Sequence, residues 1–143
     1  MDEPEILYPP RRQLSWDVPT PLRLEFEEAQ MCFSARAYKA TVVMVRRVLE
    51  GACKENGVKE RTLAQSLEGL RADGLIDATL SEWANALRIL GNEGAHYSGT
   101  EVPREDAEDA VAFAEALLNH IYVLRKRFLE FTKRRASGSA ESI

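Results

Sequence analysis

Cysteine and histidine are scarce in this sequence. Cys32 and Cys53 are too few for a disulfide framework. Because both lie in apolar helical contexts, we expect reduced, buried thiols and a cytoplasmic protein. With only two histidines in addition, no Cys/His cluster has metal-ligand spacing. The sequence therefore predicts neither a metal site nor another cofactor.

Long apolar runs are also missing, and none approaches the length that spans a bilayer. The N-terminal segment MDEPEILYPP is acidic and lacks the apolar stretch of a signal peptide. We therefore expect no membrane association. A net charge of −4 disfavours a protein that binds nucleic acid over its whole surface. The 143 residues suffice for one compact domain with a substantial core.

Positive charge is nevertheless concentrated near the C-terminus. The run RKRFLEFTKRR, residues 125–135, carries six basic residues against one glutamate. Basic residues at the end of a helix complement its dipole, and a charge run is often a solvated face. The same run would also suit nucleic acid, and its candidate binding residues are Arg125, Lys126 and Arg127. Both interpretations stay open from the sequence.

Proline and helical periodicity divide the chain into three parts. Four of the six prolines fall within residues 1–19, which predicts an extended N-terminal arm anchored by Tyr8, Leu14 and Trp16. Helical spacing of apolar residues then runs through 20–135. It predicts an all-α bundle of about five helices. The segment ASGSAESI, residues 136–143, is typical of a disordered tail.

Turn and capping residues predict where the first four helices begin and end. Thr20 is the expected N-cap of the first helix. Gly57 and Gly74 are the expected stops of the second and third helices. Thr79 and Glu82 have the spacing of a capping box at the start of the fourth.

The fifth helix is expected to run from near Pro103 to about Arg135, with apolar residues spaced alternately by three and four. These residues are Ala107, Ala110, Ala114, Leu117, Ile121, Leu124, Phe128 and Phe131. Such spacing is typical of a helix packed along a neighbour for its full length. The alanine end predicts close helix approach, and the phenylalanine end predicts a helix that reaches beyond a small bundle. A core face and a dimer contact both fit this seam.

Three polar residues stand four apart in RILGNEGAH: Arg88, Asn92 and His96. On a continuous helix they form one slanted stripe, because each step of four rotates by about 40°. Arginine, asparagine and histidine together suit an anion. The alternative is a hydrogen-bonded helix end, since Gly91 and Gly94 weaken a helix. Those glycines would also let another backbone or a ligand approach.

A second candidate binding site lies in the middle of the second helix and consists of Arg46, Arg47 and Glu50. Arg46 and Glu50 have the spacing of a solvated ion pair. If Glu50 faces inward, it needs a buried partner, and Arg88 is the best available. We predict that Glu50 is at least partly buried and bonded to Arg88 or to the backbone near Asn92.

Several motifs in order along the chain resemble a known family. They are LYPP and VP in the arm, EEA at 27–29, RRVLE at 46–50, the leucines at 63 and 67 with Gly74, R..GN..AH at 88–96, and EDA at 105–107. Together they resemble the bacterial domain-of-unknown-function family 4145, a branch of the HEPN superfamily. The resemblance implies a HEPN-like helical bundle that pairs as a homodimer.

The resemblance also implies roles for the polar stripe. Many HEPN proteins are metal-independent ribonucleases of toxin–antitoxin and phage-defence systems, with a site formed where two protomers meet. Carried over to this chain, Arg88 stabilises charge on the scissile phosphate. His96 moves the proton of the attacking 2′-hydroxyl or of the leaving oxygen, and Asn92 orients one of these two groups. Two features depart from the catalytic members. Seven residues separate Arg88 from His96, and the apolar Ile89 follows the arginine.

These departures favour a non-catalytic module over an enzyme. We expect a binding or interaction domain that contacts RNA or a nucleotide in a bacterial defence or stress system, with a partner protein encoded nearby. The first alternative is a metal-independent endoribonuclease that uses Arg88 and His96. The second is a purely structural dimerisation domain.

Overall fold

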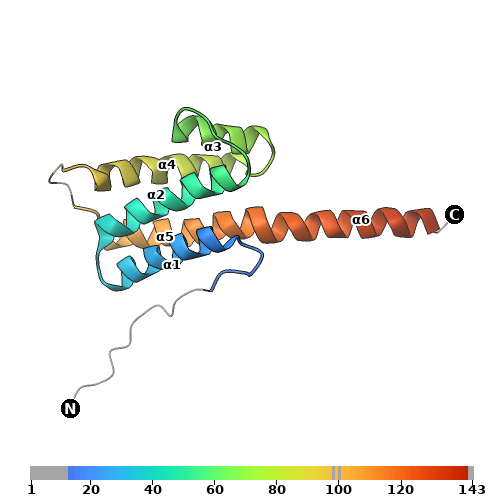
Figure 1. Cartoon of the computed structure of the whole chain (residues 1–143), viewed down its shortest axis with the longest axis horizontal. Helices are drawn as coiled ribbons and strands as arrows, with labels where there is room; N and C mark the ends of the chain where they lie inside the picture. The colour runs from blue at the N-terminus through green and yellow to red at the C-terminus, as the bar shows by residue number, and fades with distance from the viewer. Residues whose placement is uncertain (1–12, 98, 100, 142–143) are drawn as a thin grey trace, which may run out of the picture.

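The computed structural model describes residues 13–97, 99 and 101–141, and within them every regular element is a helix. Four helices come first: α1 (Thr20–Ser34), α2 (Tyr38–Glu55), α3 (Leu63–Ala72) and α4 (Ala78–Ala95). Then α5 (Arg104–Asn119), the π-helical turn η1 (His120–Leu124) and α6 (Arg125–Glu141) follow without a break as one long rod (Figure 1). The expected all-α bundle of about five helices with a long last helix is confirmed.

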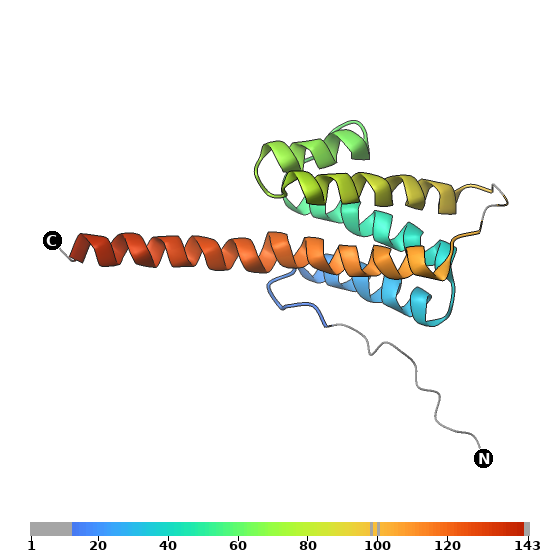
Figure 2. The ribbon, with the colours of Figure 1, turned by 180° about the vertical axis from the view of Figure 1, so that it is seen from behind.

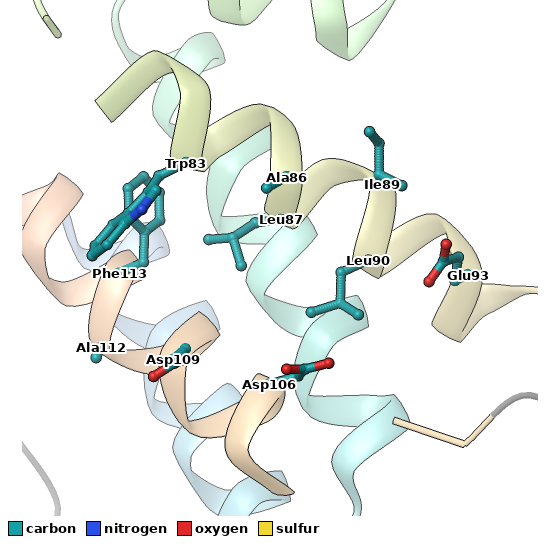
Figure 3. A pocket seen from close by; sticks show the side chains of 10 residues that line it. All are labelled: Trp83, Ala86, Leu87, Ile89, Leu90, Glu93, Asp106, Asp109, Ala112 and Phe113. Atoms are coloured by element: carbon teal, nitrogen blue, oxygen red, sulfur yellow. The ribbon is translucent and has the colours of Figure 1, made fainter. Parts of the chain in front are cut away.

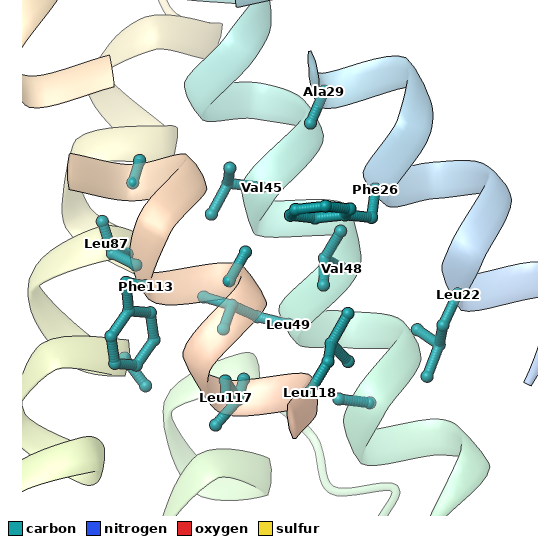
Figure 4. Packing of buried hydrophobic residues seen from close by; sticks show 14 of the residues in the cluster. Leu22, Phe26, Ala29, Val45, Val48, Leu49, Leu87, Phe113, Leu117 and Leu118 are labelled. Carbon is teal, nitrogen blue, oxygen red and sulfur yellow. The ribbon is translucent and has the colours of Figure 1, made fainter. Parts of the chain in front are cut away.

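Helix α2 is the centre of the bundle and packs against α1, α3, α4 and α5. Helices α4 and α5 both lie on α2 but touch each other only slightly (Figure 2). The core forms where α1, α2 and α5 meet. Phe26, Val45, Leu49 and Leu117 are fully buried there (Figure 4). This arrangement follows from the apolar stripes of the helices, which each need a partner face.

The apolar seam of the last helix divides into two halves. From Ala107 to Ile121 its residues are buried, so their predicted core role is confirmed. From Leu124 onward the rod leaves the bundle, and Phe128 and Phe131 are 64% and 51% exposed. Figures 1 and 2 show α6 projecting well past the other helices. The phenylalanine end does reach beyond the bundle, as expected from the sequence.

Helix α4 does not end at its glycines but continues through Gly91 and Gly94 to Ala95. A Cβ atom on Gly91 would stand 2.8 Å from the Cβ of Arg46 and 3.1 Å from the backbone oxygen of Val42. One on Gly94 would stand 2.8 Å from the Cγ2 of Val42. Because the two glycines have no side chains, α4 can lie directly against α2.

The predicted helix stops are correct, but two predicted N-caps are wrong. Gly57 and Gly74 adopt φ angles of 73° and 76°, which favour glycine and end α2 and α3. The residue before α1 is Pro19, so Thr20 already belongs to the helix. Pro21 then lies in the first turn of α1, where the fixed φ angle of proline suits a helix and its missing N–H is not needed.

The start of α4 also differs from the prediction. Asp77 caps this helix, and its carboxylate accepts a hydrogen bond from the backbone N–H of Leu80 at 2.8 Å. Thr79 and Glu82 lie inside the helix instead of forming a capping box. Aspartate is a somewhat stronger N-cap than threonine. Since Asp77 comes first in the chain, the helix starts earlier than expected.

The predicted arm lies mostly outside the described residues, and Tyr8 is among those that are not described. Leu14 packs against the core as predicted. Trp16 does not, because its side chain is 85% exposed and stacks with the Arg23 guanidinium 4.1 Å from the ring centroid. At the arm's end, Asp17 accepts a hydrogen bond from Lys126 at 2.9 Å, which ties it to the start of α6.

The C-terminal end differs from the disordered tail predicted for 136–143. Helix α6 continues through Ala136 and Gly138 to Glu141. Serine and glycine lower helix propensity by under about 1 kcal/mol each, whereas only proline stops a helix outright, and the segment has none. Among the described residues, no helix is both long enough and apolar enough to cross a membrane.

Candidate anion-binding groove

A polar groove of about 600 Å³ lies between α2, α4 and the segment that leads into α3. Arg46 and Glu50 line it from α2, and Arg88 and Asn92 line it from α4. The third side is formed by residues 58–64. The close α2–α4 contact at the glycines determines this geometry, because it brings RRVLE and the first part of R..GN..AH to one site.

The charge of this groove is opposite to that of the chain. Its basic lining residues are Arg46, Lys54, Lys59, Arg61 and Arg88, against two acidic residues, Glu50 and Glu60. A groove with an excess of positive charge on a chain of net charge −4 is a local feature rather than a consequence of composition. Such a site attracts anions.

Arg46 is a half-buried basic residue of this groove. Its Nε lies 3.4 Å from the Glu50 carboxylate, and its side chain is 27% exposed. Its Nη1 is buried and has no hydrogen-bond partner among the described residues. An unsatisfied buried donor of this kind costs about 1–3 kcal/mol, and more when it is charged. Its ion-pair partner in the described chain, Glu50, therefore leaves part of the Arg46 guanidinium unsatisfied.

Arg88 faces the same groove from α4. Its Nε donates a hydrogen bond to the Oδ1 of Asn85, one turn earlier, at 3.2 Å. No ion pair to Arg88 is found within the described part of the chain. Asn92 lies one turn further along and adds an amide with both donors and an acceptor. The two residues present the groups expected for an oxyanion.

His96 lies away from this groove. It is the C-cap of α4, its side chain is exposed, and its backbone N–H donates to the Glu93 oxygen at 3.3 Å. Eight residues of helix place it about 12 Å along the axis from Arg88 and rotate it by about 80°. Within one chain the structure therefore joins Arg88 with Asn92 and separates both from the predicted proton-transfer residue.

The sequence model of one family, described as Domain of unknown function (DUF4145), matches residues 27–134. This match covers most of the chain and includes every residue of the groove. The chain belongs to this family. Searches of curated proteins and of solved structures gave no match to it.

The predicted bond between Glu50 and Arg88 is wrong in this DUF4145 chain. The Glu50 side chain is 51% exposed and pairs with Arg46 on its own helix. A partner one turn away requires less ordering than a partner on another helix, and the pair keeps its contact with water. The solvated ion pair, which was the alternative interpretation, is confirmed.

This geometry makes Glu50→Ala a mild substitution. We expect it to change the free energy of unfolding by about 0–1 kcal/mol, since exposed ion pairs contribute little. Chemical denaturation followed by circular dichroism measures the change. Glu68→Ala, which removes the exposed i,i+3 partner of Arg71 on α3, is the matched control. A loss of several kcal/mol at Glu50 alone would mean that it supports a buried group.

The remaining predicted binding residues lie elsewhere in the DUF4145 fold. Arg47 donates two hydrogen bonds to the Glu25 carboxylate, at 2.8 and 2.7 Å, and so joins α2 to α1. These bonds hold the pKa of Glu25 below its usual value. Arg125, Lys126 and Arg127 are exposed on α6, which does not line the groove. Hydrogen bonding to Lys126 lowers the pKa of Asp17 in the same way.

Three basic residues of the groove were not predicted from the sequence: Lys54, Lys59 and Arg61. They come from the end of α2 and the segment before α3, where no helical period relates them to Arg46 or Arg88. The only signal was local, a cluster of charged residues around the turn at Gly57. Their shared position depends on how α3 folds back over α2 and α4.

The two cysteines are free and carry no sign of reactive chemistry. Burial, and then the nearby Glu50 carboxylate, raise the pKa of Cys53 to about 11. Burial also raises the pKa of the half-buried Cys32. Both thiols are therefore protonated at neutral pH and poorly nucleophilic. In the described part of the chain, no group of three or more His, Cys, Asp or Glu residues could hold a metal ion.

Proposed function

We propose that this DUF4145 chain is a non-catalytic, HEPN-like binding module whose groove takes a phosphate-bearing ligand, RNA or a nucleotide, in a bacterial defence or stress system. The observation that carries this proposal is the groove's excess of basic residues, among which Arg46 from α2 and Arg88 from α4 line the same site. The HEPN relationship is supported by the resemblance of RRVLE and R..GN..AH.

Phosphate is the anion that fits these groups best. The guanidinium groups of Arg46 and Arg88 are planar forks that match two oxygens of one phosphate. The Asn92 amide can bind a base or a sugar hydroxyl beside it. The volume of about 600 Å³ is in the range of small-ligand sites, so the groove has room for a nucleotide unit.

The position of His96 supports binding rather than cleavage. A general acid or base must lie within hydrogen-bond reach of the group whose proton it moves. One chain does not bring His96 into the groove that holds Arg88. The alternative, a metal-independent endoribonuclease, keeps one supporting observation. His96 is exposed at the end of α4, where a second copy of the chain could complete a composite site.

We expect Arg46→Ala and Arg88→Ala each to weaken binding of a short single-stranded RNA at least tenfold. A charge-assisted hydrogen bond contributes about 1.5–3 kcal/mol, which corresponds to about 10- to 150-fold in affinity. Fluorescence anisotropy of a labelled RNA of mixed sequence measures this. The dependence on salt should also become shallower, because the slope of log K against log salt falls by about 0.7 for each phosphate that the variant no longer neutralises.

Arg71→Ala is the matched control for these variants. Arg71 is an exposed arginine on α3 that does not line the groove, so its loss changes the net charge equally. We expect less than a twofold effect on affinity. Equal weakening by all three variants would mean that the RNA responds only to overall charge. Unchanged binding by Arg46→Ala and Arg88→Ala would overturn the proposed site.

A further inference from the structure

The end of the rod, from Leu124 of η1 into α6, carries an apolar surface that no other described helix covers. Leu124, Phe128, Leu129 and Phe131 are each between 51% and 64% exposed. Basic residues surround them, so this surface is both apolar and positive. Monomeric soluble proteins rarely expose a contiguous apolar surface of this kind to solvent, and such a surface often marks an interaction site.

A second apolar surface lies on the bundle itself, in a groove of about 480 Å³ between α4 and α5. It exists because α2 holds these two helices apart. Figure 3 shows Leu87 and Leu90 extending from α4 toward α5. At one end Trp83, which is 55% exposed, meets Phe113 edge to face with the ring centroids 5.1 Å apart.

The rim of this α4–α5 groove is acidic. Glu93 from α4 and Asp106 and Asp109 from α5 line it, and its described lining contains no basic residue. The groove and α6 are therefore complementary in two respects, apolar against apolar and negative against positive. Complementary potentials of this kind select partners and fix their register.

The α6 helix of a chain cannot enter its own α4–α5 groove. It continues α5 through η1 in one straight rod and projects away from the bundle (Figure 2). A second copy meets no such restriction. Independently of the ligand proposed above, we propose that this chain forms a twofold dimer in which α6 of each copy lies in the α4–α5 groove of the other.

The spacing of the two surfaces along the rod supports this occupant. The α5 side of the groove runs from Asp106 to Phe113, and the apolar surface of the rod runs from Leu124 to Phe131. These two ranges lie at equal distances on either side of the peptide bond between residues 118 and 119. If two copies pack with their rods antiparallel about a twofold axis near that bond, the apolar surface of each copy lies opposite the groove of the other. Each copy then places its α6 in the groove of the other, and the two equal contacts form a closed, self-complementary interface. A continuous rod provides both halves of this contact.

Sedimentation velocity of the full chain at micromolar concentration tests the proposal. We expect wild type to be a dimer. Phe128→Glu, which puts a negative charge on the apolar face of α6, and Asp109→Arg, which reverses part of the groove rim, should each raise the dimer dissociation constant at least about tenfold. Both side chains are exposed, so neither change should unfold the chain. Leu24→Glu, at a residue of α1 that is 59% exposed, should leave the dimer intact.

Mixing the two variants distinguishes this dimer from a pairing of α6 with itself. The intact α6 of Asp109→Arg can still enter the intact groove of Phe128→Glu, so the mixture should associate more strongly than either variant alone. Loss of the dimer in Phe128→Glu but not in Asp109→Arg would show that α6 pairs with its own copy, which would overturn the proposal. A monomeric wild type at this concentration would overturn it as well.

Discussion

Replacing Phe26 with alanine is expected to lower the free energy of unfolding by about 3–5 kcal/mol, which is the usual cost of removing a buried phenylalanine. The Phe26 side chain is completely buried. Figure 4 shows it extending from α1 over α2, beside Val45 and Val48. The surrounding helices cannot collapse fully into the space, so a cavity adds to the lost apolar burial.

Urea denaturation followed by circular dichroism measures this loss. Leu24→Ala on the same helix is the matched control, because that leucine is 59% exposed and its truncation should cost less than about 1 kcal/mol. Similar losses in the two variants would mean that α1 does not pack as described.

Gly91→Ala is expected to be destabilising although alanine is the better helix former. The new Cβ would stand 2.8 Å from the Cβ of Arg46 and 3.1 Å from the Val42 backbone oxygen, so α2 and α4 must move apart. Overpacking costs about 1–3 kcal/mol, whereas the gain in helix propensity is about 1 kcal/mol. We expect a net loss of stability. Because Arg46 is displaced, we also expect weaker RNA binding.

The control for this variant is Gly138→Ala in α6, where an added Cβ meets no atom of another helix within 4 Å. There only the gain in helix propensity remains, so stability should be unchanged or slightly higher. Thermal denaturation of the two variants beside wild type measures both effects. An increase in stability for Gly91→Ala would contradict the close α2–α4 contact.

Much of the fold was predictable because burial requires a periodic apolar face. The seam from Ala107 to Ile121 indicated a helix packed in the core, and its continuation through Phe128 and Phe131 indicated a helix that extends beyond it. Helix boundaries were less predictable. Asp77 and Thr79 are chemically similar N-caps, and the sequence alone does not show which of them ends the preceding turn.

The site was predictable only in part, because its residues come from three separate segments. Arg88 and Asn92 were found together since four residues of helix place them on one face. The partner of Glu50 was predicted wrongly because sequence spacing does not show which face of α2 lies toward α4. Lys59 and Arg61 depend on the path of an irregular segment, which has no period to follow.

The integrity of RNA incubated with the purified chain in excess EDTA, beside His96→Ala, tests the central claim most directly. We expect wild type and His96→Ala to bind labelled RNA with similar affinity and to leave it uncut. General acid–base catalysis contributes about 10²–10⁴-fold to a rate, so a true ribonuclease would lose nearly all cleavage with that histidine. Cleavage by wild type that His96→Ala lacks would contradict a non-catalytic groove and establish the endoribonuclease instead.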